Sequence, residues 1–133
     1  MRDAFEAVGA WRLMWKKIPA SDYTQAGDPL KIDCGYKPNG TVKLFHALAL
    51  ENEIDSAKIL AFSYPAIKEG IGRKLKASAE LTAFINTNIK DPSHQSDSQV
   101  AFALETLAAS GIQVATVGDL GRYAESARRD MGL

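Results

Sequence analysis

A cysteine and a histidine, the pair that a thiol nucleophile and its general base require, stand in two neighbouring segments of alternating residues. Cys34 lies within 30–36 and His46 within 41–50, and the intervening 38–40 reads proline, asparagine and glycine. These turn-forming residues predict a β-hairpin. Pairing of its strands would make Cys34 and His46 diagonal neighbours. Their surroundings are apolar and contain no orienting acid, so the sequence predicts an inert, buried thiol.

The pairing that we expect in this hairpin places Tyr36 opposite Val42 and Asp33 opposite Phe45. Because successive residues of a strand point to opposite faces, each face of the hairpin then carries several apolar side chains. A sheet with two apolar faces is covered on both sides. We therefore expect helices on both faces of the sheet.

Periodic apolar residues predict the remaining elements. The order α-β-β-α-β-α-β-α predicts one domain, 1–133, of mixed α/β class, with a mixed sheet covered by helices. The same sequence fits a whole protein or a domain excised from a longer chain. The predicted helices span 4–18, about 54–76 with Pro65 bending or ending it, 100–108 and a last segment from 119, and the further strands span 81–86 and 112–117.

The hairpin followed by a helix and further strands resembles, in layout alone, the restriction-endonuclease-like fold. That resemblance implies Mg²⁺ held by acidic residues on two neighbouring strands, with a lysine near the attacking water. Asp33 would be the first ligand. The acidic-x-lysine pair typical of these enzymes is absent, and Asp33 lies several positions along its strand from Glu51, so an Asp33 paired with a surface lysine is favoured. Under this alternative the second ligand would be Glu51 or Glu53, and the lysine Lys31 or Lys43.

Other motifs predict no cofactor. Two glycine-containing segments, 70–74 and 118–121, lack the spacing of nucleotide-binding loops. His94 lies in a polar loop, and two histidines with one cysteine at these distances do not make a zinc site. Mg²⁺ therefore enters only with the nuclease alternative.

The composition argues against several classes of protein. Sixteen lysines and arginines balance sixteen aspartates and glutamates, so a nucleic-acid partner is not favoured, although basic residues gather at 12–17 and 73–76. The single cysteine excludes an intramolecular disulfide and indicates a reducing, cytoplasmic location. The apolar runs are too short to span a bilayer, so no membrane partner is expected.

The sequence contains no catalytic motif. It therefore favours a non-catalytic binding or regulatory domain that acts on another macromolecule, and a protein is the favoured partner. Its contact surfaces would be the hairpin turn, the loop 86–98 and, if no helix covers it, the hairpin face that bears Phe45. An exposed Phe45 beside charges would anchor a partner, whereas a covered Phe45 would belong to the core. The candidate contact residues are Lys31, Lys37, Asn39, Lys43 and Phe45.

Overall fold

The computed structural model describes residues 1–50, 54–86 and 97–133, which form a five-stranded mixed sheet in the order β1-β2-β3-β4-β5. The first three strands are an antiparallel meander, and the last three run parallel to one another. The parallel pairs are joined by helical crossovers, as parallel pairing requires. The strands are β1 (Trp15–Pro19), β2 (Lys31–Tyr36), β3 (Thr41–Leu48), β4 (Ser78–Ile85) and β5 (Gln113–Thr116).

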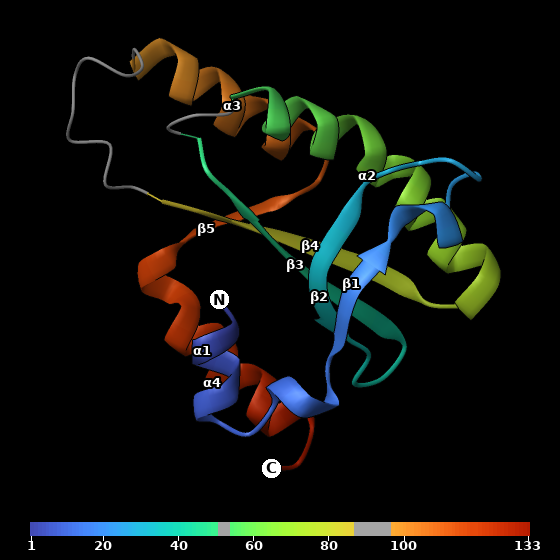
Figure 1. Cartoon of the computed structure of the whole chain (residues 1–133), viewed down its shortest axis with the longest axis vertical. Helices are drawn as coiled ribbons and strands as arrows, with labels where there is room; N and C mark the ends of the chain where they lie inside the picture. The colour runs from blue at the N-terminus through green and yellow to red at the C-terminus, as the bar shows by residue number, and fades with distance from the viewer. Residues whose placement is uncertain (51–53, 87–96) are drawn as a thin grey trace.

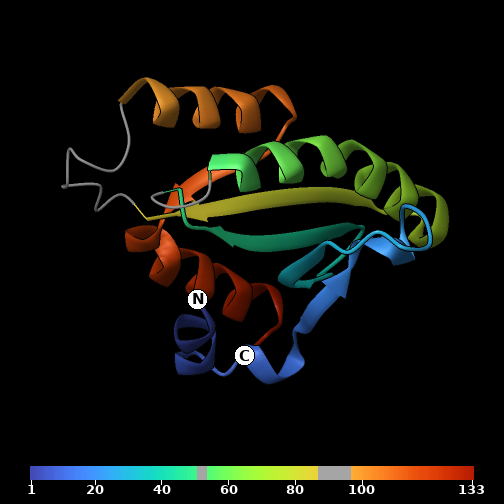
Figure 2. The same ribbon diagram turned by 45° about the horizontal axis from the view of Figure 1, so that its top comes forward.

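Helices cover both faces of the sheet, as the two apolar faces of the hairpin predicted. Figure 2 shows α2 and α3 on one side of the strands and α1 and α4 on the other. Short 3-10 turns connect several elements, and the two chain ends lie in the α1/α4 layer (Figure 1). The mixed α/β class is confirmed. The α-helices of the described segments are α1 (Arg2–Ala7), α2 (Ile54–Leu75), α3 (Asp97–Ala109) and α4 (Leu120–Asp130).

Two apolar clusters hold these layers together. The first lies between the sheet and the α2/α3 layer, where Leu60, Tyr64 and Ile67 of α2 meet Leu44 and Leu81 of the strands. The second lies between the sheet and the α1/α4 layer. It contains, among others, Phe5, Phe45, Phe84, Leu120 and Ala127. Burial of such side chains supplies most of the free energy that offsets the ordering of the chain.

The N-terminal segment differs from its prediction. The helix expected over 4–18 ends at Ala7, and Gly9, with a φ of 78°, turns the chain away from the helical path. Trp15–Pro19 pairs with β2 as the edge strand β1, and Trp15 is partly exposed. The backbone hydrogen bonds of a fifth strand therefore outweigh the helical periodicity of this segment. The rest of the predicted order is confirmed.

The hairpin is confirmed, but its register is shifted by one residue. Tyr36 pairs with Lys43 instead of Val42, and Cys34 pairs with Phe45 instead of Leu44. A shift of one residue exchanges the faces of all side chains on one strand relative to the other. The observed register places Phe45 among the aromatic rings of the second cluster, a burial that the turn residues alone could not predict.

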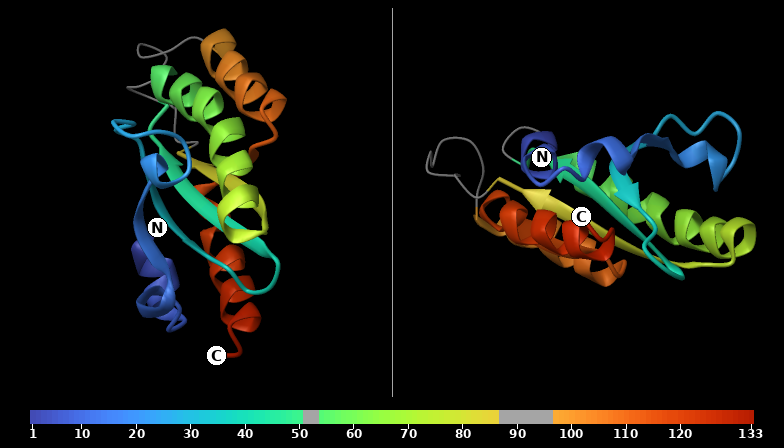
Figure 3. Two further views of the ribbon diagram at one scale, coloured as in Figure 1. Left: turned by 90° about the vertical axis from the view of Figure 1, so that its right-hand side faces the viewer. Right: turned by 90° about the horizontal axis from the view of Figure 1, so that it is seen from below.

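The second half of the chain follows its predictions closely. The helix predicted to bend or end at Pro65 does not end there, because α2 continues through this residue, which lies on its exposed side. Figure 3 shows α3 lying beside the N-terminal half of α2. In the described ranges we find no helix that is both long and apolar enough to cross a membrane.

Candidate functional site

Asp33 links β2 to β3 just beyond the last regular pair of the two strands. Its Oδ2 accepts a hydrogen bond from the Ala47 N–H at 2.8 Å, and its own N–H donates to His46 Nδ1 at 3.3 Å. The same Oδ2 lies 3.5 Å from His46 Nδ1. The carboxylate thus accepts the hydrogen bond of a backbone N–H in β3, that of Ala47, for which the strand ladder provides no acceptor.

Lys43 is not brought to Asp33. It lies opposite Tyr36 in the hairpin, and its Nζ donates to Asp130 Oδ2 at 3.1 Å. Tyr36 Oη donates to the same oxygen at 2.7 Å. The hydroxyl and the ammonium group both hold the pKa of Asp130 below its usual value. This network fastens the end of α4 to β2 and β3.

The ligand set of a magnesium nuclease does not assemble from the described residues. Outside the gaps at 51–53 and 87–96, no three histidine, cysteine, aspartate or glutamate side chains lie close enough to hold a metal ion. Glu51 and Glu53 fall within the first gap and so lie outside the described residues. The nuclease alternative therefore stays a prediction that rests on Asp33.

Cys34 and His46 do not form a nucleophilic pair. In the observed register, Cys34 stands opposite Phe45, and it is His46 that contacts Asp33. The Cys34 thiol lies 4.0 Å from the Met1 sulfur, and burial, assisted by the Asp33 carboxylate, raises its pKa to about 12. A thiol with this pKa is protonated at neutral pH and is a poor nucleophile, as the apolar surroundings predicted.

Phe45, the aromatic residue of the expected contact face, is only 3% exposed. Its ring packs against Phe5 of α1 at a centroid distance of 5.3 Å and against Tyr123 of α4 at 6.1 Å. Helices cover this face, so Phe45 is a core residue. The exposed Lys31 stands at one end of β2, and the hairpin turn stands at the other, so the candidate contact residues do not form one surface. Lys37 and Asn39 are exposed in that turn.

A small polar cavity lies beneath α4. It has a volume of about 160 Å³ and is lined by Lys43, Glu80, Thr82 and Gln113 of the strands, together with side chains of α4. Thr82 is buried, and its hydroxyl donates to Gln113 Oε1 at 3.3 Å. Thr82 and Gln113 thus bond to each other inside the cavity, while Tyr36 and Lys43 of its lining bond to Asp130.

The most exposed large apolar side chain of the described residues, Phe62, lies on the outer side of α2. Phe62 is 88% exposed and Ile59 is 55% exposed, although both belong to a regular helix. Together with Ser63 they line an open groove of about 600 Å³ against the segment 25–30. At the edge of this face that borders α3, Lys58 Nζ lies 5.4 Å from the ring of Phe102. We call the side of α2 opposite its buried stripe the outer face of α2. It carries Asp55, Lys58, Ile59, Phe62, Pro65, Ala66, Glu69 and Arg73, which are all exposed.

The sequence contains a signal for this face. The apolar stripe of the predicted helix accounts for its buried side, and Ile59 and Phe62 do not lie on that stripe. A helix that covers a core on one side normally carries polar residues on the other. Two large apolar residues opposite the stripe therefore mark a second contact surface, which the expectation of a hairpin site overlooked.

Comparisons with known proteins add no relative. No family model, no curated protein and no solved structure matches the chain. The functional conclusion therefore rests on the molecule's own geometry.

Proposed function

We propose that this chain is a non-catalytic protein-binding domain and that the outer face of α2 is its contact surface. The observation that carries the proposal is the 88% exposure of Phe62 on a rigid helix, next to the exposed Ile59. Exposed aliphatic residues scattered singly are ordinary, but contiguous large apolar side chains on a monomer mark interaction sites. Aromatic anchors of this kind commonly dominate the binding free energy of an interface.

The surroundings of Phe62 support a protein partner over a small ligand. The groove beside it is open along the segment 25–30 instead of enclosing a volume on all sides. Binding sites for small molecules usually bury most of the ligand in a cleft, whereas protein interfaces are extended, with an apolar centre and a polar rim. Lys58 and Ser63 supply such a rim on the two sides of Phe62.

Cross-linking from a single site tests the proposal. A Ser63→Cys variant carries one accessible thiol, because Cys34 is the sole cysteine of the chain and is buried. A thiol-linked photoreactive probe at this position should cross-link to a protein in an extract of the native host. The same probe on Ser126→Cys, in α4 on the opposite side of the sheet, should not.

A second pair of variants makes the result specific to the apolar anchor. Phe62→Ser, combined with Ser63→Cys, should abolish the cross-link. Val117→Ser removes an apolar side chain that is 51% exposed but lies outside α2, and in the same background it should leave the cross-link intact. An unchanged cross-linking pattern in the Phe62→Ser protein would refute the outer face of α2 as the contact surface.

The nuclease alternative has its own test. A magnesium nuclease that uses Asp33 must cleave labelled DNA or RNA with Mg²⁺ or Mn²⁺, and must lose cleavage both in Asp33→Ala and with EDTA. The carboxylate of Asp33 already accepts the Ala47 N–H, and Lys43 already binds Asp130. We therefore expect no cleavage by the wild-type protein.

A further inference from the structure

The order of charges along the outer face of α2 suggests what binds there. At about 100° per residue, eight positions between 55 and 73 fall on one side of the helix. From the N-terminal end they read acidic, basic, four central residues that include the apolar anchor, acidic, basic. They are Asp55, Lys58, Ile59, Phe62, Pro65, Ala66, Glu69 and Arg73, and all of them are exposed.

This pattern is complementary to itself when it is reversed. A two-fold axis level with position 64 would set Asp55 of one copy opposite Arg73 of the other. The two such pairs would lie about 27 Å apart along the helix, which is the distance between positions 55 and 73 at a rise of about 1.5 Å per residue. The same axis brings Lys58 within one residue of Glu69 of the second copy. Every charge then meets its opposite, whereas a parallel pairing of two α2 helices would set like charges together.

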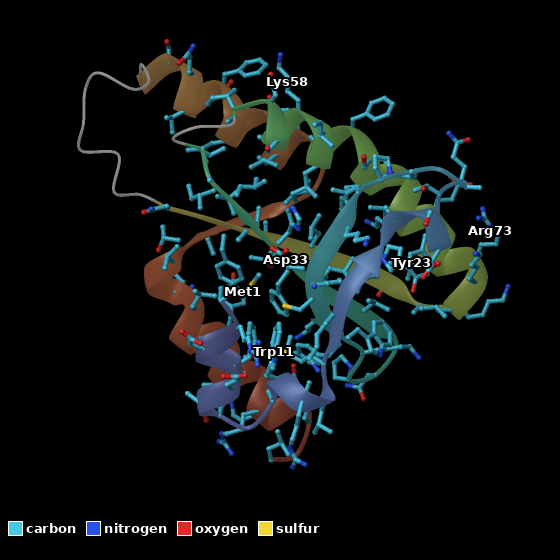
Figure 4. The ribbon with its side chains drawn as sticks, viewed as in Figure 1. Met1, Trp11, Tyr23, Asp33, Lys58 and Arg73 are labelled. Atoms are coloured by element: carbon cyan, nitrogen blue, oxygen red, sulfur yellow. The ribbon has the colours of Figure 1, made fainter. Side chains whose placement is uncertain are left out.

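The centre of the same arrangement is apolar. Phe62 would lie over Ala66 of the second copy, whose small side chain leaves room for the ring, and Ile59 would lie beside it. Among the described residues, Asp55, Glu69 and Arg73 form no ion pair within one chain, so these charges are available to another molecule. Figure 4 shows Lys58 near one end of α2 and Arg73 near the other.

We propose that the occupant of the outer face of α2 is a second copy of this chain, bound with the two α2 helices antiparallel around a two-fold axis level with position 64. This inference rests on the proposed function and names its partner. Phe62 supplies the apolar contact, and the pairs Asp55–Arg73 and Lys58–Glu69 fix the orientation and exclude the parallel arrangement.

Charge reversal followed by sedimentation velocity over a range of protein concentrations tests the pairing. Lys58→Glu or Glu69→Lys alone replaces two attractive contacts with two repulsive ones in the symmetric dimer, and each should raise the dimer dissociation constant by about tenfold. The double variant with both changes should restore dimerisation. Lys68→Glu makes the same change of charge on the same helix but outside the eight positions, and it should have no effect.

A cross-link tests the axis itself. Ala66 lies two residues from the proposed axis, so the two thiols of an Ala66→Cys dimer would be offset by about 6 Å along the helix, within reach of a short bismaleimide. Ser126→Cys should give no dimer band. A dimer that forms but survives both Phe62→Ser and the single charge reversals would overturn this interface.

The two proposals can fail separately. A chain that stays monomeric at every concentration, yet loses its cross-link to another protein with Phe62→Ser, would overturn the second copy as occupant and leave the binding face in place. A chain that neither dimerises nor gives any cross-link dependent on Phe62 would overturn both.

Discussion

Phe45 and Phe62 are the same residue type, but Phe45 is buried and Phe62 is exposed. This difference in exposure distinguishes the two sides of the sheet on which they lie. Phe45 is enclosed by aromatic rings from α1, α4 and the strands, and its layer ends in a network that fastens α4 to the sheet. Phe62 projects from a helix whose opposite side already covers the sheet. One side of the molecule therefore encloses its central aromatic ring, while the other leaves a large aromatic ring exposed.

The largest expected effect sets these two residues directly against each other. Phe45→Ala should lower the free energy of unfolding by about 3 to 5 kcal/mol, because it leaves a cavity in the second cluster. Phe62→Ala should change it by less than about 0.5 kcal/mol in dilute protein, where association does not contribute. Urea denaturation measures both. Equal losses in the two variants would remove the distinction between the closed and the exposed side.

The next prediction concerns how firmly α2 is held, since a contact surface needs a rigid support. A Cβ at Gly70 would clash with the Tyr23 carbonyl oxygen, which is backbone and cannot yield easily. Gly70→Ala should therefore cost about 2 to 3 kcal/mol. Tyr23 lies against the C-terminal half of α2 (Figure 4), where Lys74 also donates to the Asp22 carbonyl.

Gly72→Ala is the matched control on the same helix. A Cβ there meets the Ala77 carbonyl oxygen at 3.7 Å, an ordinary contact, so the substitution should be neutral or slightly stabilising through its helix propensity. If both variants unfolded at the same urea concentration as the wild type, the close approach between α2 and Tyr23 would be refuted.

Local signals in the sequence predict much of this fold. The proline, asparagine and glycine at 38–40 predict the hairpin, and apolar periodicity predicts α2, α3, α4, β4 and β5. The signal fails where pairing partners decide the outcome. Trp15–Pro19 has a helical spacing of apolar residues, yet it becomes a strand because β2 offers an edge with free donors and acceptors.

The candidate site was harder to predict than the fold, for a related reason. The side to which Phe45 points depends on a one-residue register, and that register depends on the aromatic cluster that only the folded chain assembles. Phe62 needed no such information, because its place opposite the buried stripe of α2 follows from spacing alone. Phe45, which the sequence offered as an anchor only if no helix covered it, is therefore a core residue, and the exposed aromatic residue is Phe62.

A third prediction concerns the closure of the α4 side. Tyr36→Phe removes the hydroxyl that donates to Asp130 at 2.7 Å, and it should cost about 1 to 2 kcal/mol, since the acceptor is charged. Tyr123→Phe removes the same atom in the same layer, from a hydroxyl that forms no hydrogen bond within the described segments. It should cost less than about 0.5 kcal/mol. Equal urea midpoints for the two variants would show that the network does not hold α4.

The smallest effect is the dependence of stability on pH through His46, at the end of β3. Burial lowers the pKa of His46 from 6.5, and the neighbouring Asp33 carboxylate opposes that shift only in part. Its Nδ1 accepts the Asp33 N–H, and a protonated imidazole cannot accept that bond. The unfolded chain therefore binds the proton more readily, so stability is full above the unfolded pKa and falls as the pH drops below it.

Carboxylates with a lowered pKa, such as Asp130, contribute stability that is lost only in more acidic solution. The change in the free energy of unfolding between about pH 7.5 and 5.5 is therefore due to histidines. Urea midpoints over this interval should fall in the wild type and in His94→Gln, which removes the only other histidine of the chain. They should fall less in His46→Gln, whose amide does not titrate. If His94→Gln removed the pH dependence of the urea midpoint and His46→Gln did not, the titrating group would lie outside the Asp33–His46 contact. Among the described residues, the Ala47 N–H would then be the only contact left to position the carboxylate of Asp33.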